Sequence, residues 1–270
     1  MKISTFIIDT FTATRFKGNP TAVCYLDTTL NTTVMQSVAA ELNLPVTAFI
    51  KKDTREKQLY DIQYFTVTTE IPACGHATLG AAFVVMEKDN PDEVTFRTAG
   101  GVTINTVLKD GFVTMTYPRY EMKPYTVSEA ILESLHIGQY EMAGYCTELE
   151  TVFIELNDPA ELRKIQPDFT KMLAVNNAGK EIVVTAVSDI ANYDFLLRSF
   201  CPWIGINEDP VTGSVHTVLA GFWQNKLKKN RLKAYQASER GGELTVISYE
   251  DKVELGGQCV MLFKGELNVD

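Results

Sequence analysis

The sequence predicts an α+β fold of two pseudo-symmetric lobes, each a β-barrel-like sheet wrapped around a central helix. Two observations support this prediction. First, two helical segments, 75–87 and 213–226, each begin at a glycine and carry apolar residues nearly all round, as buried helices do. Second, short apolar runs typical of strands flank both segments. Strands curled around a buried helix, formed twice, satisfy this pattern.

The first half of the chain has one further helix and a series of short strands. We expect Thr32 or Thr33 to cap a helix that ends near Leu42, with Val34, Val38 and Leu42 on one face. We expect strands at 2–9, 21–26, 47–51, 59–65, 93–97, 102–108 and 112–117.

The second half begins near Arg119 and has a similar order of strands and helices. We expect a helix over 128–135 and strands at 151–156, 182–187, 193–200, 233–237, 244–249 and 259–263. The predicted domains are an N-terminal lobe, 1–118, and a C-terminal lobe, 119–258. The last strand, within about 259–270, is a candidate to return to the N-terminal lobe. Residue matches between the two helix entrances are weak, so the predicted repeat is one of architecture.

Composition excludes several classes of partner. The chain has 270 residues, 45% of them hydrophobic, which is enough for a large core. The net charge of −9 argues against a broad nucleic-acid or anionic-membrane surface, because such surfaces need clustered Lys and Arg. A small anionic substrate needs only a local pocket of donors. No apolar run approaches the roughly 20 residues that span a bilayer.

The cysteines and the N-terminus predict a reduced, cytoplasmic protein. Asp9 ends the first apolar run too early for a signal peptide. The five cysteines are scattered and form no C-x-x-C pair, so we expect neither disulfides nor a zinc or redox dithiol site; they are Cys24, Cys74, Cys146, Cys201 and Cys259.

Polar residues with proton-transfer chemistry stand at the first helix entrance. Cys74 and His76 flank Gly75, whose backbone a ligand can approach closely. The first N–H groups of a helix are open donors for a carboxylate, and a helix N-terminus lowers the pKa of a thiol. The alternative is a buried structural Cys and a capping His. Two such residues within three positions favour a functional site.

A similar group precedes the second helix. Asp209 lies in a turn, and Gly213 and Ser214 offer backbone donors just before the apolar run. The alternative is an ordinary acidic helix cap. His216 weighs against that alternative, because two of only three histidines fall in these two stretches. We expect the third, His136, to be exposed at a helix end.

Two further motifs are weaker. Arg240, beside two glycines, could hold a substrate carboxylate or lie exposed in a hairpin turn. Asn19, in Gly-Asn-Pro, marks a turn. A metal site from Cys74, His76, Asp209 and His216 matches no zinc spacing, and nucleotide-binding glycine motifs are absent from the sequence. We therefore expect no metal and no cofactor.

Taken in order, these stretches resemble the PhzF-like family of phenazine biosynthesis, and they span nearly the whole chain. The segments that carry the resemblance are Asp9 to Phe11 with Phe16 to Pro20, Glu70 with Cys74 to Thr78, Glu208 to His216, and Gln236 to Gly242. The resemblance implies a diaminopimelate-epimerase-like fold with the active site between the lobes, a homodimer, and no cofactor. It also implies proton transfer on a small carboxylate, which in the best-understood relative is a dihydro-hydroxyanthranilate.

The resemblance implies that His76, Asp209 and Ser214 bind the substrate and assist, while a glutamate moves the proton. The family usually carries that glutamate in a Ser-Glu-Thr segment, but here the position is Val46. We do not transfer its role to Glu41, one helical turn earlier, because Glu41 matches a different family position.

Three hypotheses follow. The first is an isomerase or epimerase in which Cys74 and Asp209 supply acid and base. The second is a catalytically silent protein that binds a small carboxylate, with Gly75, Gly213, Ser214, Asn19 and Arg240 as ligand-binding residues in either case. The third is another cofactor-free reaction, such as a lyase or hydrolase reaction, at the same site.

Overall fold

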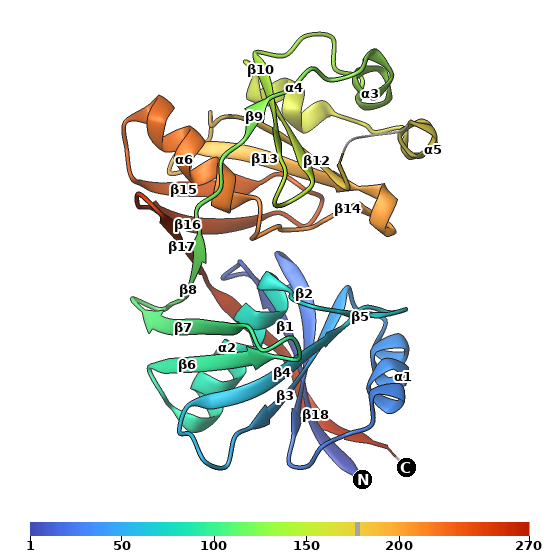
Figure 1. Ribbon diagram of the computed structural model, residues 1–270, viewed down its shortest axis with the longest axis vertical. Helices are drawn as coiled ribbons and strands as arrows, with labels where there is room; N and C mark the ends of the chain where they lie inside the picture. The colour runs from blue at the N-terminus through green and yellow to red at the C-terminus, as the bar shows by residue number, and fades with distance from the viewer. Residues whose placement is uncertain (176–178, 270) are drawn as a thin grey trace. The chain divides into compact units, whose positions relative to one another are not determined.

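The computed structural model describes residues 1–175 and 179–269, which form two compact units. Unit 1 comprises Met1–Thr116 and the described residues from Gly256 onward, and unit 2 comprises Tyr117–Leu255. Figure 1 shows the C-terminal strand, in red, beside the blue N-terminal strands of unit 1. None of the helices in the described ranges is long and apolar enough to cross a membrane.

In unit 1, strands wrap around the helix α2 (Gly75–Asp89). The strand order is β18-β1-β2-β3-β4-β6-β7-β8, and the short strand β5 pairs with β4. The bounds are β1 Lys2–Thr10, β2 Asn19–Leu26, β3 Val46–Lys52, β4 Leu59–Phe65, β5 Glu70–Ile71, β6 Glu93–Thr98, β7 Thr103–Lys109, β8 Phe112–Pro118 and β18 Cys259–Asn268.

The helix α2 is buried on nearly every side, as its apolar composition predicts. Its buried residues include Leu79, Val84 and Val85, and it contacts β1, β2, β3, β6, β7 and β18. Its small residues allow close packing: a Cβ at Gly80 would lie 2.6 Å from the Thr21 side chain. This packing fixes the N-terminus of α2 at one end of the sheet.

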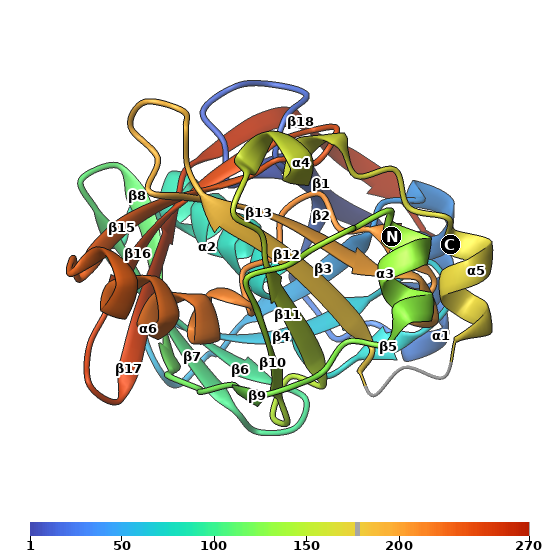
Figure 2. The ribbon, with the colours of Figure 1, turned by 90° about the horizontal axis from the view of Figure 1, so that it is seen from above.

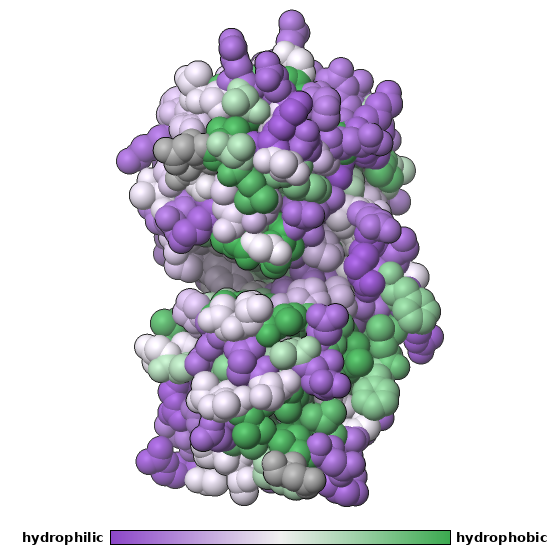
Figure 3. All heavy atoms as spheres, turned by 90° about the vertical axis from the view of Figure 1, so that its right-hand side faces the viewer, coloured by the Kyte–Doolittle hydropathy of each residue, from purple (hydrophilic) through white to green (hydrophobic). Residues whose placement is uncertain are grey.

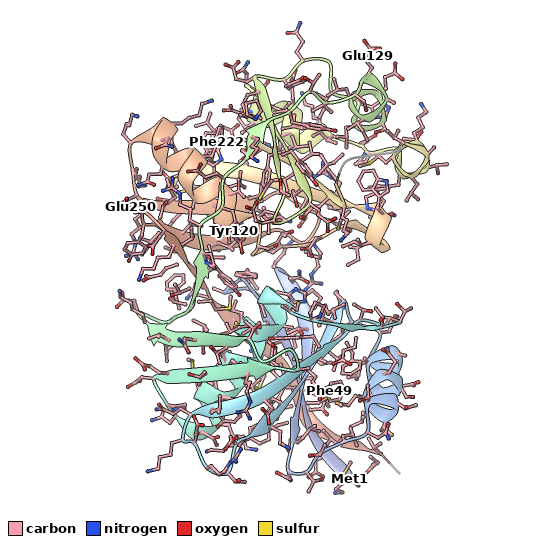
Figure 4. The ribbon with its side chains drawn as sticks, viewed as in Figure 1. Met1, Phe49, Tyr120, Glu129, Phe222 and Glu250 are labelled. Atoms are coloured by element: carbon pink, nitrogen blue, oxygen red, sulfur yellow. The ribbon has the colours of Figure 1, made fainter. Side chains whose placement is uncertain are left out.

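The helix α1 (Thr32–Leu42) covers the outer face of this sheet. Met35 and Val38 pack there with Phe49 of β3, which is labelled in Figure 4 beside α1. Figure 3 looks onto this side of unit 1, where hydrophobic residues, in green, gather in groups beside hydrophilic ones, in purple. The prediction that Thr32 or Thr33 caps α1 is wrong: Asn31 is the cap, because its side chain accepts the Thr33 N–H at 2.8 Å.

In unit 2, strands wrap around the helix α6 (His216–Leu227) in the order β9-β10-β11-β12-β13-β15-β16, and β14 also pairs with β13. Figure 2 shows α6 alongside β15 and β16. The bounds are β9 Lys123–Pro124, β10 Met142–Cys146, β11 Thr151–Glu155, β12 Glu181–Val187, β13 Phe195–Cys201, β14 Ile206–Glu208, β15 Arg231–Gln236, β16 Gly242–Ser248 and β17 Lys252–Gly257.

Three short helices and a 3-10 turn also lie among the described residues of unit 2. They are α3 (Glu129–Leu135), α4 (Pro159–Lys164), α5 (Phe169–Ala174) and η1 (Pro202–Ile204). A second hydrophobic cluster joins Ile131 and Leu135 of α3 to Ile182 and Val184 of β12. This cluster lies on the face of β12 opposite α6, so the sheet of unit 2 is covered on both sides.

The two units repeat one order of strand pairing. In unit 1 the pairs β1–β2, β2–β3, β3–β4, β4–β6 and β6–β7 are antiparallel, parallel, antiparallel, parallel and antiparallel. In unit 2 the pairs β10–β11, β11–β12, β12–β13, β13–β15 and β15–β16 follow the same order. The central helix precedes β6 in one unit and β15 in the other. The predicted architectural repeat is therefore confirmed in the topology of each unit.

Candidate active site

The helix α2 begins at Gly75, and no side chain caps its first turn. Cys74 is the N-cap residue in extended conformation, and its side chain caps none of the first-turn N–H groups. Its carbonyl instead accepts two bonds from Thr78, from the backbone N–H at 3.0 Å and from Oγ1 at 2.8 Å. The Tyr64 hydroxyl lies 2.6 Å from the same Thr78 Oγ1. These bonds hold Cys74 while leaving its thiol to other partners.

Cys74 and His76 are in direct contact. The Cys74 Sγ lies 3.3 Å from His76 Nδ1, and the Asn19 side-chain Nδ2 lies 3.4 Å from the same nitrogen. Burial lowers the pKa of His76 to about 4, so the ring is neutral at pH 7. Because Asn19 Nδ2 is a donor, Nδ1 acts as the acceptor and Nε2 carries the proton. The group pairs a thiol with a neutral imidazole, which can exchange a proton.

Asn19 is buried at the start of β2 and is placed by a tight turn. Gly18 has a φ of +67°, and a Cβ there would lie 2.1 Å from the carbonyl oxygen of Thr10, so only glycine fits. Thr10 Oγ1 donates to the Asn19 carbonyl at 2.8 Å, and Asp9 accepts the Phe16 N–H at 2.6 Å. The Asp9 to Pro20 segment thus positions Asn19 against His76.

At the second entrance the helix begins later than predicted. The segment from Gly213 was expected to be helical, but α6 starts at His216, and turn bonds run from the His216 N–H to the Gly213 carbonyl and from the Thr217 N–H to the Ser214 carbonyl. Gly213 and Ser214 therefore lie in the turn just before α6. Gly213 is buried and Ser214 is exposed, and no side chain caps the start of α6.

Asp209 is held by contacts that the sequence did not indicate. Thr212 Oγ1 donates to Asp209 Oδ2 at 2.6 Å. The buried Gln236 side chain donates to the Asp209 carbonyl at 2.7 Å, and Ser238 Oγ donates to the Pro210 carbonyl at 2.7 Å. The turn after β15 therefore supports the loop that carries Asp209.

His216 is fully buried behind this loop. Its Nδ1 donates to the Thr212 carbonyl at 2.9 Å, and burial lowers its pKa to about 4. Its Nε2 has no hydrogen-bond partner among the residues that the structure describes. In α2 the Thr78 hydroxyl makes the corresponding bond to the Cys74 carbonyl. His216 therefore positions the entrance of α6, as Thr78 positions that of α2.

Arg240 lies in the hairpin between β15 and β16, where it is partly buried. Its neighbour Gly241 has a φ of +66°, and a Cβ there would lie 2.3 Å from Tyr235 Oη.

Val46 is buried at the start of β3 and supplies no titratable group. His136 is exposed at the C-cap of α3, as expected. Within the described ranges, His, Cys, Asp and Glu form no group of three or more that could hold a metal ion.

Comparison with known proteins gives matches over nearly the whole chain. A family model described as phenazine biosynthesis-like protein matches residues 8–265. An uncharacterised isomerase of Halalkalibacterium halodurans is 37% identical over 272 residues, which cover 97% of each chain. The mouse phenazine biosynthesis-like domain-containing protein 1 is 35% identical over 286 residues, which cover 99% of each.

Solved structures support the same family and show the fold. A PhzF-family protein of Enterococcus faecalis is 35% identical and matches with a TM-score of 0.92 over all of both chains. A predicted epimerase of Pseudomonas aeruginosa, 18% identical, shares the fold with a TM-score of 0.74, over 99% of this chain and 100% of that one. The fold is diaminopimelate-epimerase-like, as the resemblance implied, and the chain belongs to the phenazine biosynthesis-like PhzC-PhzF family.

Proposed function

We propose that this protein is an isomerase or epimerase that moves a proton on a small carboxylate metabolite without a cofactor. The observation that carries the proposal is the shared design of the two helix entrances. Each has a glycine at or just before a helix start that no side chain caps, beside a side chain that can move a proton, Cys74 in unit 1 and Asp209 in unit 2. The H. halodurans relative, which is named an uncharacterised isomerase, supports the same reaction class.

In the proposed reaction both entrances serve one substrate. The Asp209 carboxylate takes a proton from a carbon next to the substrate carboxyl group, and the C–H electron pair moves into that group. Backbone N–H groups at the helix entrances stabilise the developing negative charge. The Cys74 thiol then gives its proton to carbon. The thiolate left on Cys74 and the proton left on Asp209 are reset by exchange with solvent or by the reverse reaction.

His76 and Asn19 have supporting roles in this proposal. The neutral His76 ring contacts the Cys74 thiol through Nδ1 and is proposed to hold the thiol in position. Asn19 fixes the tautomer of that ring. Gly75, Gly213, Ser214 and Arg240 are proposed to bind the substrate carboxylate, the first three through backbone donors and Arg240 through its guanidinium group.

One observation favours a second candidate, a catalytically silent protein that binds a small carboxylate. Val46 occupies the position at which the family resemblance implies a catalytic glutamate, and valine cannot carry a proton. The backbone N–H groups at the starts of α2 and α6 could bind a carboxylate equally well in such a protein. Exchange of a substrate C–H with solvent distinguishes the two candidates.

The test is proton NMR of the protein in deuterated buffer with dihydro-hydroxyanthranilate, proline, hydroxyproline and the common amino acids. The proposal predicts loss of one C–H signal, or appearance of an isomer, for at least one compound. Line broadening on binding without C–H exchange would favour the silent candidate instead.

A further inference from the structure

A cavity of about 380 Å³ opens on the outer face of the unit 1 sheet, beside α1. Small-molecule sites usually occupy roughly 300–1,000 Å³, so this volume admits one small metabolite. Its floor belongs to the hydrophobic cluster under α1 and includes Leu30, Met35 and Phe49, the last of which is labelled in Figure 4. All three side chains are buried, so the apolar floor is already formed without a ligand.

A lysine and an aspartate face each other in the wall of this cavity. Lys51 of β3 and Asp61 of β4 are opposite residues in an antiparallel register, and both line the cavity. Alternate residues of a strand point to the same face of a sheet, so Lys51 shares the face of Phe49, which α1 covers. Side chains at opposite positions stand roughly 5 Å apart at Cβ. A small ligand can therefore contact both charges at once.

Each of these two charges has another partner and keeps free bonding capacity. Lys51 Nζ donates to Thr29 Oγ1 at 2.9 Å, which uses one of the three N–H donors of an ammonium group. Asp61 Oδ1 accepts Arg97 Nε at 2.9 Å and Nη2 at 2.6 Å. Arg97 Nη2 also donates to Asp53 Oδ2, at 3.1 Å.

The second oxygen of Asp61, Oδ2, accepts no hydrogen bond from any residue that the structure describes. Within the same ranges, Lys51 forms no ion pair with a carboxylate. Both side chains are accessible, since Lys51 is partly exposed and the Asp61 side chain is 39% exposed. The cavity wall therefore offers cationic donors and an anionic acceptor side by side, above an apolar floor.

We propose that this cavity binds a free α-amino acid with an apolar side chain, such as leucine. The α-carboxylate accepts from Lys51 Nζ, the α-ammonium group donates to Asp61 Oδ2, and the apolar side chain packs on the floor. Both polar contacts are charge-assisted hydrogen bonds. A simple carboxylate would instead bring a second negative charge beside Asp61, and a simple amine would bring a second positive charge beside Lys51.

This site is separate from the candidate active site in unit 1. The cavity lies on the face of the sheet that α1 covers, whereas Cys74 and His76 stand at the start of α2, which the strands enclose. Neither Cys74, His76 nor Asn19 lines the cavity. The inference therefore does not rest on the proposed function.

The ligand class is tested by NMR of protein with ¹³C-labelled methionine methyl groups, in which Met35→Leu assigns the Met35 signal. We expect L-leucine to shift this signal to saturation. Two matched compounds should bind at least about tenfold more weakly, because each lacks one charge-assisted bond: 4-methylpentanoate, without the amino group, and 3-methylbutylamine, without the carboxyl group. Equal binding of all three compounds, or no shift with L-leucine, L-methionine or L-phenylalanine, would overturn the proposal.

The Lys51→Gln variant tests the carboxylate contact. It should weaken leucine binding by about tenfold or more, because a neutral amide replaces the charged donor. The matched control is Lys52→Gln: Lys52 is the next residue, points to the other face of β3, and pairs with Asp89 at 3.5 Å. Unchanged affinity in Lys51→Gln, or an equal loss in Lys52→Gln, would contradict the proposed site. The titration needs no turnover, so its result bears on this cavity alone.

Discussion

Gln236, the last residue of β15, binds Thr212 and Asp209 through one side-chain amide. Its Oε1 accepts the Thr212 N–H at 2.8 Å, and its Nε2 donates to the Asp209 carbonyl at 2.7 Å. Gln236 is fully buried, so water cannot replace these bonds. The amide therefore fixes both ends of the loop that enters α6.

Gln236→Ala should reduce stability and activity together. It leaves the Thr212 N–H and the Asp209 carbonyl without their buried partner, at a cost of roughly 1–3 kcal/mol for each group. A loop displaced by about 1 Å can lower a rate roughly 100-fold, so C–H exchange should fall steeply. Chemical denaturation and NMR exchange measure the two effects. The exposed Gln139→Ala is the control, and equal behaviour of both variants would disprove the role of Gln236.

Cys74→Ala should lower C–H exchange by roughly 100-fold or more, the usual contribution of one acid or base group. Cys74→Ser should be nearly as slow, because a hydroxyl is a much weaker acid than a thiol. The control is Cys146→Ala, which removes a buried thiol from unit 2. Unchanged turnover in Cys74→Ala would exclude Cys74 as the acid.

Gly18→Ala should be far more harmful than Gly111→Ala. Both glycines have positive φ, +67° and +77°, so each substitution carries a strain of about 1–2 kcal/mol. Only at Gly18 does the new Cβ meet backbone, 2.1 Å from the Thr10 oxygen, while nothing lies within 4 Å at Gly111. Gly18→Ala should also displace Asn19 and weaken binding of the substrate. Comparable melting temperatures for the two variants would refute this account of the turn.

The buried histidine predicts acid lability. The pKa of His216 is about 4 in the folded protein, against about 6.5 for an unperturbed histidine, so the unfolded state binds its proton first. The stabilising contribution is present above about pH 6.5 and is lost as the pH falls towards 4. His216→Thr, which copies Thr78 of the other unit, should be less stable at pH 7 but lose stability less steeply below pH 6.5. Denaturation midpoints at several pH values measure this, and parallel pH curves would argue against it.

The sequence predicted both central helices because each combines a long apolar run with a glycine; α2 begins at Gly75 as predicted, whereas α6 begins at His216 rather than at Gly213. The helices α4 and α5 were missed, since six residues are too few to show a helical period. Asn31 was missed as a cap because Thr32 and Thr33 are equally suitable residue types beside it.

Contacts between distant strands could not be predicted. Gln236 and Thr212 are 24 residues apart, and they meet only because β15 pairs with β13 next to the entrance of α6. The surroundings of Glu181 could not be predicted from the sequence either, because only the strand registers bring Thr151 and Ser199 to its carboxyl group.

The central claim is that Cys74 and Asp209 move a proton on a carboxylate substrate. The most direct measurement is deuterium incorporation at carbon, followed by proton NMR, for wild type, Cys74→Ala and Asp209→Asn side by side with the same panel of carboxylates. We predict incorporation by the wild type at one carbon of at least one compound and a loss of roughly 100-fold in each variant. Incorporation at the wild-type rate in either variant, or binding without incorporation in the wild type, would contradict the claim.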